Sequence, residues 1–199
     1  EWVLSSPTAV PHNRLSFGEE AARAVADVVA SGWVAAGPKV RRLEEELSRG
    51  SGRRFAVCVG SGLGALRLAL KALGAGPGDE VIVPAYSCVA LPNAVLAAGA
   101  TPVPVDVTSG EWNLDPKAVS KAVTAKTKAV IAIHTFGLIA RVPQLRHGDI
   151  PVIEDCAHAF GVSVDGKTVG SLGEIACSSF YATKLIGGGE GGVVLTDRE

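Results

Sequence analysis

Several features that would point to particular classes of protein are missing from this chain. Its 199 residues carry a formal net charge of −1, which gives no basic footprint for nucleic acid or an anionic membrane. No uninterrupted apolar run is long enough to cross a bilayer, and the first residues lack the basic and then apolar layout of a signal peptide. We therefore expect a cytoplasmic protein without a nucleic-acid or membrane partner.

Cysteine is scarce and scattered, and methionine is absent. The four cysteines form no Cys-x-x-Cys pair, and three of them lie in apolar, strand-like segments: the set is Cys58, Cys88, Cys156 and Cys177. We expect buried free thiols in a reducing compartment, not disulfides or zinc ligands. Because the sequence has no methionine and begins with Glu1, we also expect that it is not an intact translation product.

The hydrophobic pattern predicts an α/β fold. After an irregular arm, two helices are expected at 19–30 and 38–49, and from residue 56 strands alternate with helices. The expected strands are 56–59, 80–83, 101–106, 129–134, 151–154, 175–180 and 192–196, and the expected helices start near 62, 91, 116 and 142. Their apolar runs are continuous, which is typical of a mainly parallel central sheet with helices on both faces.

Lys184 is the most unusual charged residue. A lone lysine is normally a solvated surface charge, but Lys184 has no acidic residue within four positions on either side. Apolar or small residues surround it, and a glycine run follows it. Such surroundings favour the neutral amine, which is a nucleophile.

Asp155 ends another strand-like run, Pro-Val-Ile-Glu-Asp, and an acid at the end of such an apolar run must be paired or functional. A pyridoxal phosphate site needs a reactive lysine, which forms a Schiff base with the cofactor, and an acid, which pairs with the pyridinium nitrogen. Lys184 and Asp155 could supply this pair from neighbouring strand ends.

His158 and Cys156 beside Asp155 could mimic a metal cluster. Zinc would need further ligands that no spacing supplies, so we expect no metal site; His134 at a strand end is expected to be structural.

Two glycine runs could bind phosphate. The run at 187–192 contains G-x-G-x-x-G, but a strand follows where a dinucleotide fold needs a helix. The run at 60–64 lies between a strand and a helix, so its free amides would face one anion. No acid ends the second strand, which argues against NAD and favours a phosphate monoester. Ser179 could add a hydroxyl to this phosphate, or be a buried serine bonded to the backbone.

Five motifs stand in a consistent order between about Ser31 and Thr196. They are Ser61-Gly62-x-x-Ala65-Leu66, Pro77-Gly78-Asp79-Glu80-Val81-Ile82-Val83-Pro84, Glu154-Asp155-Cys156-Ala157-His158-Ala159, Gly170-Ser171-Leu172-Gly173 and Ser179-Phe180-Tyr181-Ala182-Thr183-Lys184. In these motifs the chain resembles the DegT/DnrJ/EryC1/StrS family of pyridoxal-phosphate-dependent sugar aminotransferases.

The resemblance implies the large domain of an aspartate-aminotransferase-like, fold-type I enzyme over residues 31–199, preceded by an arm and first helix at 1–30. It implies a homodimer that takes an amino group from an amino acid, by analogy glutamate, to a keto group of a nucleotide-linked sugar. Lys184 would carry the cofactor and Asp155 would pair with its pyridine nitrogen. The remaining contacts would come from His158 at the ring, and from Ser179, Gly62, Leu63 and Gly64 at the phosphate.

Departures from the family pattern keep a second hypothesis open. Leu63 stands where the family usually has threonine, and Cys88 where an aromatic residue usually stacks on the ring. The segment between Gly137 and Pro151 is about a helical turn shorter, and the family's C-terminal small domain is absent from these residues. The alternative is a truncated, catalytically incomplete protein with a binding or regulatory role.

Overall fold

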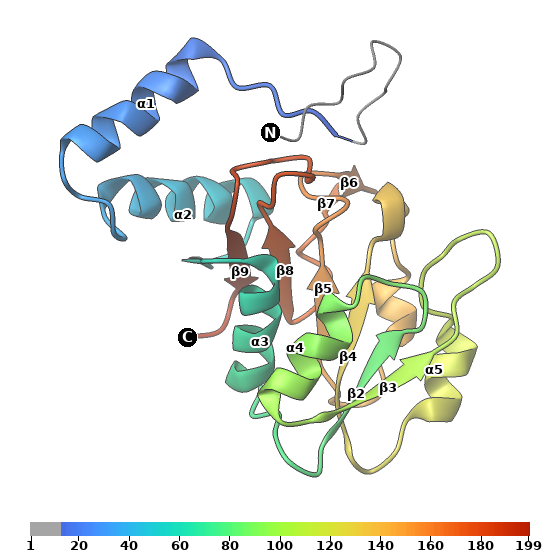
Figure 1. The fold of residues 1–199 in the computed structure, drawn as a ribbon. Coiled ribbons are helices and arrows are strands. Elements are labelled where there is room, and N and C mark those ends of the chain that lie inside the picture. Colours follow the sequence, from blue (N-terminus) through green and yellow to red (C-terminus); the bar gives the residue numbers. More distant parts are fainter. Residues whose placement is uncertain (1–12) are drawn as a thin grey trace, which may run out of the picture. The chain divides into compact units, whose positions relative to one another are not determined.

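The computed structural model describes residues 13–199, and these divide into two compact units after Ala35 (Figure 1). The first unit contains one helix, α1 (Glu19–Ala30), with two acids in its first turn and a left-handed Gly32 after its end. It matches the helix expected at 19–30. None of the described helices combines the length and apolar character needed to cross a bilayer.

The second unit is built on a seven-stranded sheet with the order β1-β9-β8-β5-β4-β2-β3. The strands are β1 (Phe55–Val59), β2 (Glu80–Pro84), β3 (Thr101–Val105), β4 (Thr127–Ile133), β5 (Val152–Asp155), β8 (Ile175–Ser179) and β9 (Gly192–Thr196). Only β9 runs against the other strands of this sheet. The expectation of a mainly parallel sheet is confirmed, and β9 is antiparallel because no crossover helix separates it from β8.

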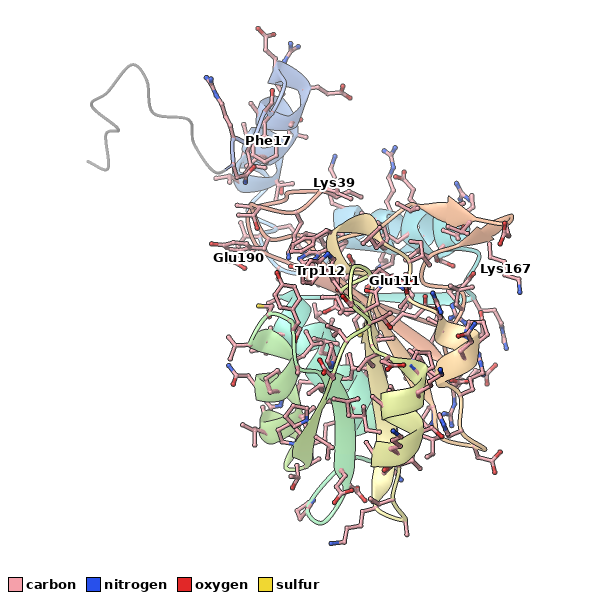
Figure 2. All side chains as sticks on the ribbon, turned by 90° about the vertical axis from the view of Figure 1, so that its right-hand side faces the viewer. Phe17, Lys39, Glu111, Trp112, Lys167 and Glu190 are labelled. Carbon is pink, nitrogen blue, oxygen red and sulfur yellow. The ribbon has the colours of Figure 1, made fainter. Side chains whose placement is uncertain are left out.

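Helices cover both faces of this sheet, as expected. They are α2 (Pro38–Ser51), α3 (Gly62–Ala72), α4 (Ala90–Ala98) and α5 (Pro116–Ala122), with 3₁₀ turns η1 (Thr135–Gly137) and η2 (Val142–Leu145). Alternate strand residues point to opposite faces: Val81 and Val83 pack in the cluster that contains α3 and α4, whereas Ile82 packs in the one that contains α5 and η2. The loop from β3 to α5 carries Glu111 and Trp112 (Figure 2).

The structure differs from the sequence expectations in a few places. A hairpin of two short strands, β6 (Ser163–Val164) and β7 (Lys167–Thr168), was not predicted. The helix expected near residue 142 is the 3₁₀ turn η2. All four thiols are free as expected, but only Cys156 and Cys177 are buried, and Cys88 is exposed. Burial raises the pKa of both buried thiols well above the ordinary value, which makes them poor nucleophiles.

Candidate functional site

A pocket of about 300 Å³ lies at the carboxyl ends of β5 and β8, beside the first turn of α3. It brings together seven of the eight residues singled out from the sequence: Gly62, Leu63, Cys88, Asp155, His158, Ser179 and Lys184. Gly64 does not line it. Residues from distant parts of the chain meet here because parallel strands end at the same edge of the sheet.

Asp155 is the last residue of β5 and is buried, with 6% of its surface exposed. Its Oδ1 accepts a hydrogen bond of 3.0 Å from the amide of Ala157. Burial raises the pKa of Asp155, and the bond from Ala157 and the positive charge of Lys184 offset that rise only in part. A cation placed at this carboxyl would therefore favour its ionised form.

Lys184 lies on the turn after β8, half-buried, and lines the same pocket. Its amide donates to the carbonyl of Tyr181 at 2.9 Å, which closes the turn. Within residues 13–199 its ammonium group makes no ion pair. The amine is thus free to meet a ligand in the pocket.

The first turn of α3 forms another part of the pocket wall. Ser61 caps the helix, and its Oγ accepts from the amide of Gly64 at 3.0 Å. The amide of Gly64 is therefore engaged with Ser61, and the part of Gly64 in a phosphate-binding turn stays a prediction. The amides of Gly62 and Leu63 have no partner in the described part of the chain, as expected for the start of a helix. Two unpaired amides at a helix N-terminus suit an anion.

Two serines of β8 adjoin this turn. Ser179 Oγ accepts from the amide of Tyr181 at 3.2 Å, and a Cβ on Gly62 would lie only 2.7 Å from Ser179 Cβ. Ser179 therefore makes a backbone hydrogen bond, as expected of a structural serine. It also lines the pocket, as expected of a phosphate ligand. Ser178 also adjoins the pocket, but its side chain points to the face of the sheet opposite that of Cys177, where its Oγ is buried without a hydrogen-bond partner among the described residues.

His158 stacks on the ring of Phe136, with centroids 5.7 Å apart and planes inclined by 4°. Burial and the positive charge of Lys184 lower the pKa of His158, so the neutral imidazole is favoured. The amide of Phe136 donates to Nδ1 at 3.4 Å. This bond assigns the proton of the neutral ring to Nε2, which makes Nε2 a donor.

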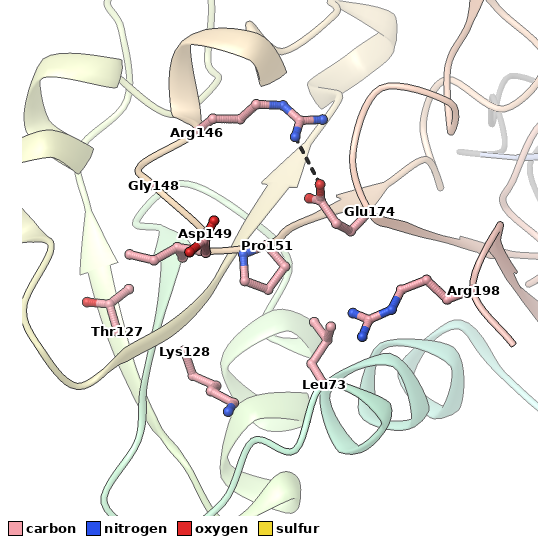
Figure 3. A pocket seen from close by; sticks show the side chains of 10 residues that line it. Leu73, Thr127, Lys128, Arg146, Gly148, Asp149, Pro151, Glu174 and Arg198 are labelled. Atoms are coloured by element: carbon pink, nitrogen blue, oxygen red, sulfur yellow. Dashed lines mark hydrogen bonds and ion pairs between the residues drawn. The ribbon is translucent and has the colours of Figure 1, made fainter.

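A second hollow, of about 590 Å³, lies at the other end of the sheet, where β4, β5 and β8 begin (Figure 3). It is lined by charged side chains that include Arg146 and Glu174, paired at 2.9 Å. It contains none of the residues singled out from the sequence. Because ligands of open α/β sheets bind beyond the carboxyl ends of the strands, the pocket around Lys184 is the candidate site.

Comparison with known proteins decides the family. The sequence pattern of the "DegT/DnrJ/EryC1/StrS aminotransferase family" matches residues 16–199. The chain belongs to this family.

One sequence relative and two solved structures support the assignment. The spore coat polysaccharide biosynthesis protein SpsC of Bacillus subtilis is 40% identical over 196 residues, which are 96% of this chain and 50% of the relative. A putative sugar aminotransferase of Streptococcus pneumoniae, Spr1654, is 31% identical with a TM-score of 0.90 over 96% of this chain and 52% of that one. DesV of S. venezuelae is 41% identical with a TM-score of 0.85, over 90% and 50%. The chain therefore spans about half the length of these family members.

Pyridoxal phosphate is the cofactor that the family members use, and the Streptococcus pneumoniae relative is known in a PLP form and a PMP form. The pocket of this chain fits the group. Asp155 is a buried acid without a hydrogen-bonded cation. The unpaired amides of Gly62 and Leu63 supply an anion site in the same pocket, and Lys184 stands on the turn after β8.

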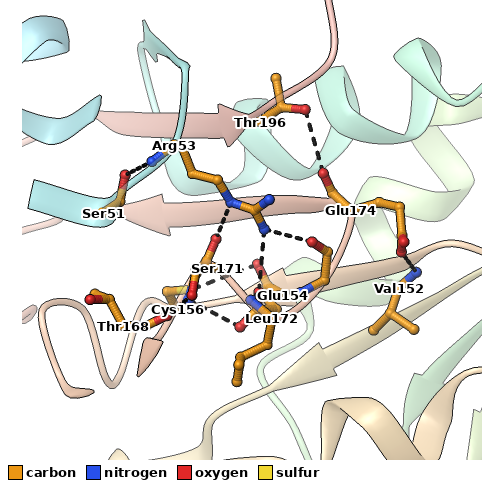
Figure 4. A network of polar contacts seen from close by, with 12 residues as sticks. Ser51, Arg53, Val152, Glu154, Cys156, Thr168, Ser171, Leu172, Glu174 and Thr196 are labelled. Carbon is orange, nitrogen blue, oxygen red and sulfur yellow. Dashed lines mark hydrogen bonds and ion pairs between the residues drawn. The ribbon is translucent and has the colours of Figure 1, made fainter. Parts of the chain in front are cut away.

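Analysis of the sequence missed the network behind Asp155 (Figure 4). Glu154 is fully buried, and its carboxylate accepts from the amides of Gly173, Leu172 and Gly170 at 2.6, 2.7 and 3.0 Å. Its Oε2 also lies 3.0 Å from His134 Nε2. Burial alone would raise the pKa of Glu154, but these hydrogen bonds outweigh it and the pKa is lowered. The network ties the end of β5 to the loop at 170–173 and so fixes Asp155.

His134, Glu154 and Cys156 offer ligand atoms within 4.8 Å of one another, which is close enough for a metal. Both nitrogens of His134 are engaged, however, because Nδ1 accepts from the amide of Ala140 at 3.1 Å and Nε2 is bonded to Glu154. The oxygens of Glu154 are saturated by backbone amides. We interpret this cluster as part of the hydrogen-bond network. His134 thus has a structural role, as expected: it links Glu154 to the amide of Ala140.

Proposed function

We propose that this chain is the cofactor-binding part of an enzyme that transfers an amino group from an amino acid, glutamate by family analogy, to a keto group of a nucleotide-linked sugar. The observation that carries the proposal is the meeting of Lys184 and Asp155 in one pocket with the unpaired amides of Gly62 and Leu63. The named relatives support the sugar as acceptor, since they include a polysaccharide biosynthesis protein and a sugar aminotransferase.

Pyridoxal phosphate, when bound, supplies an electrophilic carbonyl and a ring that accepts electrons. Lys184 would hold it at the aldehyde carbon. The amine of Lys184 would also serve as the acid–base group of the site, taking a proton from the substrate carbon. Its half-buried position on a short turn supports this role, because the side chain lines the pocket and is held in no ion pair among the described residues.

Asp155 would keep a proton on the ring nitrogen, so that the ring remains able to accept electrons. Its burial without a bonded cation supports this role, since a protonated nitrogen would satisfy it. His158 would lie against the ring and offer its Nε2 proton to the phenolic oxygen. Cys88 lies on the pocket wall and would contact the ring without stacking on it.

The phosphate would be held by the amides of Gly62 and Leu63, with the hydroxyl of Ser179 as a further donor. Both amides lie at the start of α3, where the helix dipole favours an anion. Gly64 would contribute through the shape of the turn, because its own amide is bonded to Ser61. The anchor therefore depends more on backbone amides than on side chains.

We further propose that the protein acts as a cytoplasmic homodimer. Large apolar side chains are exposed around the pocket, among them Val89 at 66%, Leu185 at 70% and Ile186 at 50%. Apolar surface of this kind beside a site is typical of an interface. The four unpaired cysteines support a reducing compartment.

The proposal is tested by following the absorbance of bound pyridoxal phosphate. Adding glutamate should bleach the yellow form, and a nucleotide-linked keto sugar should restore it. Asp155→Asn should slow the bleaching about 10²–10³-fold, the usual cost of losing one charge-stabilising group. A protein that binds the cofactor but is bleached by no amino acid would contradict transfer and favour the binding or regulatory alternative.

A further inference from the structure

Four rings form a continuous row along the carboxyl edge of the parallel strands. His158 follows β5, Phe136 follows β4, Tyr86 follows β2, and Trp112 lies on the loop after β3, which is the order of these strands in the sheet. Successive ring centroids are 5.7, 6.4 and 5.2 Å apart. These spacings are those of interacting aromatic pairs. The row begins in the pocket at His158 and leads away from it.

The outer rings of the row are exposed in a chain that has few aromatic residues. Phe, Trp and Tyr make up only 5% of the sequence, yet Phe136 is 66% exposed, Tyr86 46% and Trp112 44%. Packing of the core does not explain rings in this position. A contiguous exposed aromatic surface next to a pocket is typical of a binding site.

Buried polar side chains hold two of these rings in uncommon backbone conformations. Phe136 and Trp112 have φ of 53° and 59°, in the left-handed region that bulky residues rarely adopt. Thr135 and Asn113 are both nearly fully buried. Thr135 Oγ1 donates to the carbonyl of Trp112 at 3.0 Å, and Asn113 Oδ1 accepts from the amide of Thr135 at 3.0 Å.

Two further bonds join the same loops. Asn113 Nδ2 donates to the carbonyl of Leu138 at 3.0 Å, and Glu111, beside Trp112 (Figure 2), is ion-paired with Arg141. The loops after β3 and β4 are therefore fastened to each other on both sides of the two strained residues. Backbone strain that its surroundings over-determine is characteristic of sites pre-organised for a ligand.

We propose that this row binds the planar base of the nucleotide that carries the sugar, stacked on Trp112 and Tyr86. The inference rests on the proposed function and names where the rest of its substrate lies. The pocket of about 300 Å³ is at the small end of ligand sites, so the nucleotide must extend beyond it. The aromatic row supplies a rigid surface in that direction, and stacking accepts any base because every base has a π face.

The test is calorimetric titration of the protein with uridine 5′-diphosphate, thymidine 5′-diphosphate and base-free pyrophosphate. Both nucleotides should bind more tightly than pyrophosphate. Trp112→Ala should weaken the nucleotides about tenfold, the scale of one base–aromatic stack, and leave pyrophosphate unchanged. Trp112→Phe should recover most of the affinity. The control is Leu138→Ala, which removes an exposed aliphatic side chain (45%) from a neighbouring loop and should change neither.

Equal affinity for nucleotides and pyrophosphate, or unchanged nucleotide affinity in Trp112→Ala, would overturn the inference. Loss of a dimer in Trp112→Ala without a change in nucleotide affinity would assign the row to a second copy of the chain and would also overturn it. Borohydride trapping of pyridoxal phosphate on the same samples separates the two proposals. Trapping at Lys184 without base-dependent binding would contradict this inference alone, whereas no trapping would contradict the proposed function.

Discussion

At the scale of single residues, the carboxyl group of Asp155 links the site to stability. Its pKa is raised in the folded protein because the group is buried, so the native state holds this proton more tightly than the unfolded chain does. Stability must then fall as the pH rises through the range between the two pKa values, and the loss is complete above it. A cofactor that brings a proton on its ring nitrogen would reverse this effect.

A substitution that removes the charge of Asp155 tests this dependence of stability on pH. Without cofactor, Asp155→Asn should be more stable than the wild type at pH 7, and its advantage should vanish below about pH 4, where the carboxyl is protonated in both states. Urea unfolding of both proteins at the two pH values measures the difference. A variant that is less stable at pH 7 would mean that the carboxylate is already well compensated in the pocket.

A second residue-scale prediction concerns Leu63. It lines the pocket at the first turn of α3 and brings no hydroxyl to the proposed phosphate site. Leu63→Thr should therefore tighten the binding of pyridoxal phosphate by about 1 kcal/mol, the typical net contribution of one hydrogen bond. Leu68→Thr is the control, because Leu68 lies on the same helix with similar exposure (42% against 41%) and outside the pocket. Unchanged binding in Leu63→Thr would place the phosphate elsewhere.

At the scale of elements, the close approach of α3 to β8 sets the shape of the phosphate turn. A Cβ on Gly62 would lie 2.7 Å from Ser179 Cβ and 3.3 Å from Ser179 Cα, so neither side chain rotation nor a small shift relieves the clash. Gly62→Ala should cost about 1–3 kcal/mol of stability, as other overpacked sites do, and should weaken cofactor binding. Urea unfolding and cofactor titration measure both.

Gly60→Ala is the matched control. A Cβ there would meet nothing within 4 Å, and the backbone is not left-handed, so we expect a change of no more than about 0.5 kcal/mol. Equal effects of the two substitutions would show that the packing of α3 against β8 does not matter for the turn.

The elements themselves could largely be predicted from the sequence, because most are long enough to show a hydrophobic pattern. β5 is a buried run, and α3 presents Leu66 and Leu70 to the core. Leu63 has the helical spacing of these residues but is exposed, because it lies in the first turn of α3. The β6–β7 hairpin was missed because each strand has two residues; its Asp165-Gly166 turn, with φ of 51° and 74°, was the signal that could have found it.

Less of the site could be predicted, for a physical reason. Lys184 and Asp155 stand out locally, as a charge without a partner and an acid after an apolar run. The carboxylate network of Glu154 and the aromatic row of Trp112 depend on loops that are far apart in sequence, and no single loop has a pattern of its own. Only the order of the strands brings these residues together.

At the scale of the whole molecule, the pocket is open on the side where exposed apolar residues surround it, and the chain spans about half the length of its relatives. Positioning of reactants and exclusion of water can account for about 7–11 kcal/mol of a barrier. We therefore expect these 199 residues to bind the cofactor weakly, to dimerise, and to give no multiple turnover of a keto sugar. Sedimentation and a steady-state assay measure this; robust turnover would contradict it.

Attachment of pyridoxal phosphate to the chain tests the central claim most directly. The protein is incubated with the cofactor, reduced with borohydride, digested, and mapped by mass spectrometry, with Lys184→Arg as the control. The adduct should be found on the peptide that contains Lys184 and should be missing from the variant. An adduct on Lys128 or Lys167 in its place, or a Lys184→Arg protein that is labelled as strongly as the wild type, would contradict the account.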